Sequence, residues 1–150
     1  MSKPYIHAQS SAKKFGGEWE DYIEIHEFMD SSKVVVADNR HRALTHNSWF
    51  IGTVIPRVFG EVFQRKSDGM NVSSRDVAEQ HVAEDFGNKF IPSAGDYINE
   101  IEYKDWMQNG HGAPPSYAKI LSNKRTKTID VFEELKKIEQ LRNVSNLLVD

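Results

Sequence analysis

The sequence predicts a mainly α-helical fold, a single-domain helical bundle with a small β-hairpin. Three observations predict it. Apolar residues recur with a helical period in most segments, glycines or serines separate these segments, and one stretch carries the turn chemistry of a hairpin. A chain of 150 residues is long enough to form one domain with a buried core. Its 39% of hydrophobic and 27% of charged residues are typical of a globular protein.

Two helices are predicted near the N-terminus, from His7 to Phe15 and from Glu18 to about Asp30. Gly16 and Gly17 end the first helix, because glycine adopts the left-handed conformation of a helix C-terminus. Acidic residues in the first turn favour the start of the second helix. His26 falls near the middle of the apolar arc of that second helix. The arc consists of Trp19, Tyr22, Ile23, Ile25 and Met29.

The stretch from Gly52 to Ser73 is compatible with two predictions. Glu61 to Lys66 and Met70 to Ser73 fit the two strands of a hairpin, because Ser67-Asp68-Gly69 supplies a turn between them. A helix over Val54 to Phe63 fits the apolar residues equally well.

The second half of the chain begins with a clearly marked helix, which Ser73 caps and Gly87 ends. Short helical turns follow around Tyr97 and Trp106, and Asn109 to Pro115 is a loop by composition. We place a boundary near Asn123: residues 1–122 form the helical domain, and residues 123–150 form a basic linker and an amphipathic C-terminal helix.

The stretch from Asp38 to His46 reads D-N-R-H-R-A-L-T-H, and it combines charged groups with imidazoles. On one continuous helix, Asp38 and Arg42 project along nearly the same line as the apolar Val35 and Trp49, with the two histidines of the stretch at the borders of that arc. If the apolar residues face the core, the polar residues between them face it too. A buried charge is too costly to persist unless it is paired, hydrogen-bonded or bound to a metal.

Polar residues also occupy the apolar face of the helix that Ser73 caps. His81 and Asp85 lie four residues apart at the centre of its apolar face. Together with His26 and the stretch around His46, three helices therefore carry polar groups on inward faces. Each helix can satisfy these groups by meeting another helix, so we expect a single cluster.

One hypothesis is that this cluster binds a divalent metal such as Zn, Mn or Fe, since imidazole and carboxylate suit these ions. The expected metal ligands are His26, His46, His81 and Asp85. Arg42 and Asp38 are the expected catalytic residues, with Arg42 binding an anionic group of a small-molecule substrate. A metal-bound water would then hydrolyse a phosphoester or a nucleotide.

The alternative hypothesis is that the cluster is a structural network, with Arg42 paired to Asp38 or Asp85. Core histidines are more often of this kind. The protein would then be a non-enzymatic interaction module, such as a phage-encoded inhibitor of a host protein. Its C-terminal helix would bind a protein partner or drive self-association.

The composition excludes several classes of protein. The chain has no cysteine, which rules out disulfides and thiolate metal sites. A net charge of −3 gives no general attraction to nucleic acid. Since no apolar run approaches the roughly 18 residues of a membrane span, and the N-terminus has no signal-like apolar segment, we expect a cytoplasmic protein that does not bind membranes.

Two motifs carry a resemblance to a known family. R-H-R-A-L-T-H (Arg40 to His46) and E-Q-H-V-A-E-D-F-G (Glu79 to Gly87), together with the upstream H-A-Q-S-S-A-K-K-F-G-G and E-I-H, resemble an uncharacterised family of small phage and bacterial proteins. The similarity covers roughly His7 to Met107. It implies a phage or bacterial cytoplasmic protein and no particular activity, and the histidines and Asp85 are the residues that it carries over.

The sequence also bears comparison with the HD-type phosphohydrolases, which are all-helical and bind metal through histidines and aspartates. It departs from them because no histidine is followed directly by aspartate.

Overall fold

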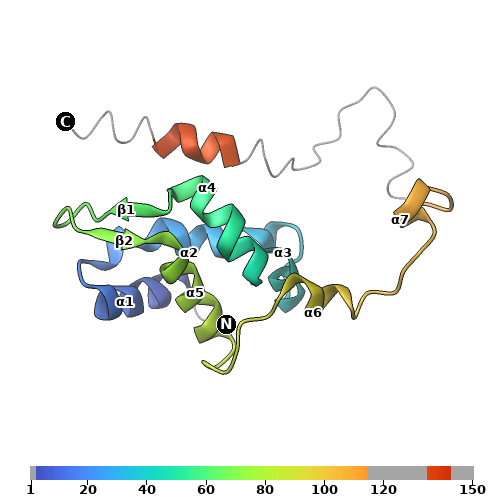
Figure 1. The fold of residues 1–150 in the computed structure, drawn as a ribbon, viewed down its shortest axis with the longest axis horizontal. Helices are drawn as coiled ribbons and strands as arrows, with labels where there is room; N and C mark the ends of the chain where they lie inside the picture. The colour runs from blue at the N-terminus through green and yellow to red at the C-terminus, as the bar shows by residue number, and fades with distance from the viewer. Residues whose placement is uncertain (1–2, 115–134, 143–150) are drawn as a thin grey trace. The chain divides into compact units, whose positions relative to one another are not determined.

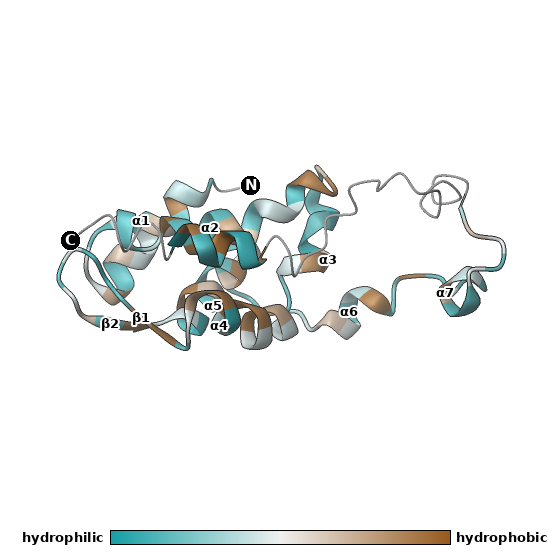
Figure 2. Ribbon diagram, turned by 90° about the horizontal axis from the view of Figure 1, so that it is seen from above, coloured by the Kyte–Doolittle hydropathy of each residue, from teal (hydrophilic) through white to brown (hydrophobic). Residues whose placement is uncertain are grey.

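The computed structural model describes residues 3–114 and 135–142 (Figure 1). The chain forms two units, Met1–Ile98 and Asn99–Asp150. Its described part is mainly helical and contains a small two-stranded antiparallel sheet, which confirms the predicted fold class. In Figure 2, hydrophobic and hydrophilic residues share the helices of the first unit, as expected where each helix has one buried face.

The first unit begins with helix α1 (Pro4–Phe15), which starts earlier than predicted because proline is well accommodated in a first helical turn. Gly16 ends it with a φ of 92° and a ψ of −179°, so the glycine has the expected positive φ but not the left-handed helical conformation that was predicted. The second predicted helix is divided into a 3₁₀ turn, η1 (Trp19–Asp21), and helix α2 (Ile23–Asp30). At this division Tyr22 is fully buried and donates its hydroxyl hydrogen to the Gly16 carbonyl at 2.6 Å.

The segment after α2 differs from the prediction of one continuous helix. It consists of the 3₁₀ turns η2 (Ser31–Val34) and η3 (Asn39–His41) and the single turn α3 (Arg42–Thr45). Three consecutive β-branched valines weaken a helix here. Asp38 ends it, because its side chain accepts the backbone N–H of Arg40 and so competes with helical hydrogen bonding.

Both predictions for the stretch from Gly52 to Ser73 are partly right. The π-helical turn η4 (Phe50–Val54) leads into helix α4 (Ile55–Phe59). After Gly60, strands β1 (Val62–Gln64) and β2 (Asn71–Ser73) form the predicted hairpin, with Phe63 opposite Val72.

Helix α5 (Ser74–Asp85) matches the prediction closely. Ser73 is its N-cap, and its hydroxyl oxygen accepts the backbone N–H of Asp76 at 3.4 Å. Val77 and Val82 on its inner face are fully buried, and they share the core of the first unit with Tyr22, Met29 and Ile55. This core surrounds the polar cluster that is described below.

Helix α6 (Ala94–Ile98) closes the first unit. The second unit contains helix α7 (Trp106–Asn109) and a helix over residues 135–142, which lies within the predicted C-terminal helix. The predicted boundary at Asn123 and the basic linker lie outside the described residues. Within the described residues, no helix has both the length and the apolar character to cross a membrane.

Candidate metal centre

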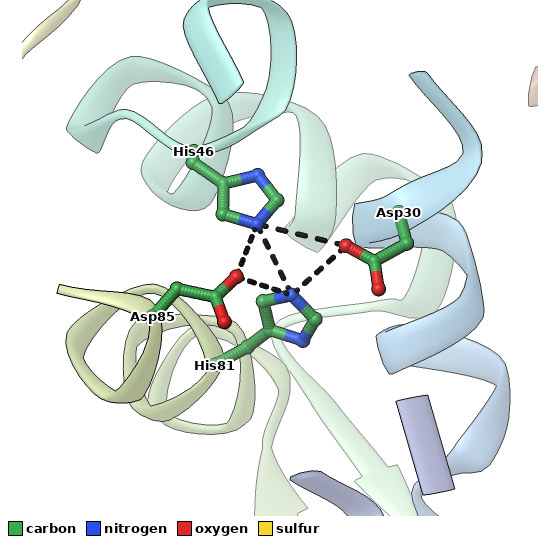
Figure 3. A group of neighbouring side chains, drawn as sticks. All are labelled: Asp30, His46, His81 and Asp85. Carbon is green, nitrogen blue, oxygen red and sulfur yellow. Dashed lines mark hydrogen bonds and ion pairs between the residues drawn. The ribbon is translucent and has the colours of Figure 1, made fainter. Parts of the chain in front are cut away.

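Four side chains from α2, α5 and the residue that follows α3 meet in the core of the first unit, and we call them the central cluster: Asp30, His46, His81 and Asp85. Each offers one nitrogen or oxygen atom, and these four atoms all lie within 4.8 Å of one another. Figure 3 shows the two imidazoles pointing toward each other, with the carboxylates on either side. Both histidines are fully buried, and the side chains of Asp30 and Asp85 are only 8% and 5% exposed.

The separations between these atoms match those of metal ligands. His46 Nε2 lies 3.1 Å from His81 Nε2, 2.9 Å from Asp85 Oδ2 and 3.7 Å from Asp30 Oδ1. His81 Nε2 lies 3.4 Å from each carboxylate oxygen. A tetrahedral ion with ligand bonds of about 2.1 Å needs ligand separations of about 3.4 Å. The cluster therefore has the dimensions of a site for one ion.

Helix geometry explains how the chain places these residues. His81 and Asp85 are one turn apart on α5, so their side chains lie on the same face. Asp30 is the last residue of α2, and His46 directly follows α3. The prediction that polar groups from separate helices converge is confirmed.

The hydrogen bonds of Thr45 assign the tautomer of His46. The Thr45 hydroxyl lies 2.7 Å from the Met29 carbonyl oxygen, which can only accept, so Thr45 donates its one hydrogen there. His46 Nδ1 lies 2.8 Å from the same hydroxyl oxygen and must donate to it. A neutral His46 therefore carries its proton on Nδ1 and presents a bare Nε2 to the cluster.

The tautomer of His81 follows from a longer chain of hydrogen bonds. Gln80 donates its amide hydrogens to the His7 carbonyl and to Glu84, so its oxygen accepts from Ser11. Because the Ser11 hydroxyl has no further hydrogen, it accepts from His26 Nε2 at 2.7 Å. The other nitrogen of His26 is then bare, and it lies 2.9 Å from His81 Nδ1.

One proton must lie between those two Nδ1 atoms, and His81 has to provide it. His81 consequently donates from Nδ1, and its neutral form presents a bare Nε2 to the cluster, as His46 does. Two imidazole lone pairs and two carboxylate oxygens thus face a common point. Such an arrangement is repulsive unless a cation, either a proton or a metal ion, lies between them.

Asp85 is held from behind by His7. His7 Nε2 lies 3.1 Å from Asp85 Oδ1, and His7 Nδ1 lies 3.2 Å from Glu84 Oε1. Burial opposes a charge on His7, but the hydrogen bonds to Asp85 and Glu84 outweigh it and raise the pKa of His7. Because His7 contacts Oδ1, the other carboxylate oxygen of Asp85, Oδ2, is free to face the cluster.

The pKa values of the cluster favour cation binding. Burial lowers the pKa of His46 to about 4, although the nearby Asp85 carboxylate acts in the opposite direction. Burial would raise the pKa of Asp30, but its close contacts with His81 and Lys33 lower it to about 2. For Asp85 too, the close contacts with His46 and His7 outweigh burial, and its pKa lies well below the ordinary value. At neutral pH the carboxylates are ionised and His46 is neutral, as metal binding requires.

Cationic and unpartnered groups flank the cluster. Arg42 Nη2 lies 3.9 Å from Asp85 Oδ2, and the guanidinium carbon lies 5.3 Å from the centre of the Phe86 ring. Lys33 Nζ lies 3.1 Å from Asp30 Oδ2. Within the described part of the chain, Arg42 Nε and His41 Nε2 are buried without a hydrogen-bond partner. Lys33 and Arg42 thus place a positive charge beside each carboxylate of the cluster.

Two of the predicted site residues lie elsewhere. Asp38 was expected to face inward, but its side chain is 56% exposed and pairs with Arg40 at 2.8 Å. The helix breaks before Asp38, so projection along one continuous helix gave it the wrong direction. His26 is fully buried as expected, but it contacts His81 through Nδ1 and lies behind that ligand, outside the group of four.

The sequence prediction missed Asp30 and the role of His7. Asp30 had a detectable signal, because H-E-F-M-D (His26 to Asp30) repeats the H-x-x-x-D spacing of H-V-A-E-D (His81 to Asp85). That spacing places an imidazole and a carboxylate on the same helical face in both α2 and α5. No comparable local signal marks His7, whose partners are more than 70 residues away along the chain.

The fold and the cluster define a class: a small helical protein with a buried histidine–aspartate cluster that could hold a metal ion. The chain belongs to the family described as a domain of unknown function, DUF6915, whose model matches residues 2–107. No curated protein and no solved structure matches the chain significantly. The prediction of an uncharacterised family is thus confirmed, while a phage origin stays a prediction. The matched range contains the whole central cluster.

Proposed function

We propose that the central cluster binds one divalent transition-metal ion. The observation that carries the proposal is the hydrogen-bonding pattern, which leaves both Nε2 atoms bare and directs them at two ionised carboxylates. Partners behind metal-binding histidines commonly fix the ligating nitrogen in this way. The separations of His46 and His81 from each other and from the two carboxylates, 2.9 to 3.7 Å, lie around the value of about 3.4 Å for a tetrahedral site and support the same conclusion.

The identity of the ion decides what the site can do. Zinc bound tetrahedrally by four protein ligands has no open position, as in structural zinc sites. Manganese or iron with six ligands would keep positions for water and substrate. Two imidazoles and two carboxylates suit all three ions.

We further propose that the loaded site hydrolyses a phosphoester or a nucleotide. The support is electrostatic. Asp30 and Asp85 are balanced by Lys33 and Arg42, so a divalent ion leaves an excess of two positive charges at a buried site. An anionic substrate would neutralise this excess. The unpartnered Arg42 Nε is available to hydrogen-bond a phosphoryl oxygen.

Metal analysis of tag-free protein tests the first proposal. We expect about one ion of Zn, Mn or Fe per chain, and thermal stabilisation of the metal-free protein by the same ion, because a ligand of the folded state raises its stability by mass action. Protein that contains no stoichiometric metal, and that none of the three ions stabilises, would rule the site out.

A matched pair of arginine variants tests the phosphoester proposal. Arg42→Gln removes the guanidinium beside the cluster, whereas Arg40→Gln removes one that is 83% exposed. With bis(4-nitrophenyl) phosphate and each metal, Arg42→Gln should lower kcat/KM by roughly 10- to 100-fold, the value of a charge-assisted hydrogen bond. Arg40→Gln should have no effect. Lack of activity with all three metals would leave a metal-binding protein that is not this hydrolase.

A further inference from the structure

Behind the central cluster, a hydrogen-bond chain runs through three helices. It begins at Ser11 on α1, passes through His26 on α2 and reaches His81 on α5. Ser11, His26 and His81 are all fully buried. Because water does not reach these groups, each must obtain its hydrogen bonds from its neighbours in the chain.

We propose that His26 is a positioning residue for metal binding: it accepts the Nδ1–H of His81 and so fixes the tautomer whose Nε2 is free to bind the ion. This inference rests on the proposed metal-binding function. A neutral imidazole can carry its proton on either nitrogen, and a proton on Nε2 would block that nitrogen as a ligand. His26 prevents this, because its own proton is committed to Ser11.

The geometry separates this role from that of a ligand. His26 Nδ1 is 2.9 Å from His81 Nδ1, on the side of the ring opposite to the cluster. The two ring planes are inclined by only 20° and their centres are 5.1 Å apart, so the rings lie side by side with one Nδ1 facing the other. Because the His26 proton is on Nε2, facing Ser11, His26 Nδ1 is an acceptor.

Two substitutions of His26 test the role. His26→Leu fills the space but cannot accept a hydrogen bond, whereas His26→Asn retains an acceptor near the position of Nδ1. We expect the zinc Kd, measured by competition with a chelator, to weaken by about 10- to 100-fold in His26→Leu. It should stay within a few-fold of wild type in His26→Asn. The recovery in His26→Asn distinguishes a positioning role from simple filling of the core.

Two further variants keep the test decisive if His26→Leu folds poorly. Ser11→Ala removes the acceptor of the His26 proton, which releases His26 to carry that proton on Nδ1, and it should weaken zinc binding measurably. Val77→Ala loosens the same helix as His81 without touching the hydrogen-bond chain. It should lower Tm and leave the zinc Kd unchanged.

Long-range ¹H–¹⁵N NMR of the zinc-bound protein reads the tautomer directly. We expect His26 to be protonated on Nε2 and bare on Nδ1. A proton on His26 Nδ1, or equal zinc Kd values for wild type, His26→Leu and Ser11→Ala, would overturn the positioning role. Failure of the wild-type protein itself to bind zinc, manganese or iron would instead overturn the proposed function.

Discussion

The substitution Asp85→Asn provides the sharpest test of the central cluster. It keeps the shape of the side chain but removes the charge of an oxygen that lies 2.9 Å from His46 Nε2 and 3.4 Å from His81 Nε2. Loss of a hydrogen-bond partner behind a ligand typically weakens metal binding 10- to 100-fold, so loss of a charged ligand should weaken it by at least about 100-fold.

This factor converts into a thermal shift. At a metal concentration of about 100 times the wild-type Kd, binding stabilises the folded protein by about 2.7 kcal/mol, and Tm should rise by about 5–11 °C for a chain of this size. At the same concentration the variant gains only about 0.4 kcal/mol, which corresponds to about 1–2 °C. Differential scanning fluorimetry with and without metal measures both shifts, each relative to the same metal-free protein.

Asp38→Asn is the matched control, because it makes the same chemical change at an exposed carboxylate that pairs with Arg40. It should leave the metal-induced shift at the wild-type value. A full shift in Asp85→Asn would refute the assignment of Asp85 as a ligand. An equal loss in both variants would refute the placement of the site in the buried cluster.

Three further predictions concern stability. Burial holds the pKa of His46 in the folded protein near 4, against an ordinary 6.5. Because protonation of His46 therefore favours the unfolded state, the metal-free protein should lose about 3 kcal/mol of its free energy of unfolding as the pH falls from 6.5 to 4. Urea titrations across this range measure the loss, and a free energy that does not change with pH would contradict the prediction. Ser73→Ala should cost about 1 kcal/mol through loss of the α5 N-cap, and an unchanged urea midpoint would argue against that cap. Gly16→Ala should lower the free energy of unfolding by about 1–3 kcal/mol, because the residue has a φ of +92° and an added Cβ would lie 2.6 Å from Arg65 Nη1. Gly52→Ala is the control: an added Cβ there has no atom within 4 Å, so this substitution should not destabilise the protein by a comparable amount.

Much of the fold is predictable because its signals are local. The Ser73 cap, the apolar face of α5 and the terminating Gly87 lie within one short stretch, and each acts through neighbours along the chain. The Ser67-Asp68-Gly69 turn likewise joins two strands that follow each other directly. The continuous helix through Asp38 failed because an Asp side chain can replace helical hydrogen bonds, and periodicity alone does not detect that competition.

The candidate site likewise has a part that the sequence predicts and a part that it does not. The sequence by itself determined that His81 and Asp85 share one helical face and that polar groups occupy positions where a core residue is expected, since both follow from spacing on a helix. Only the tertiary structure decided that Asp30 joins the cluster while His26 stands one layer behind it. Both lie on the same face of α2, but they contact different atoms. His26 contacts Nδ1 of His81, behind the cluster, whereas Asp30 Oδ1 lies near the Nε2 atoms of both His46 and His81, inside it. Such contacts depend on how separate helices pack against one another, which no local pattern encodes.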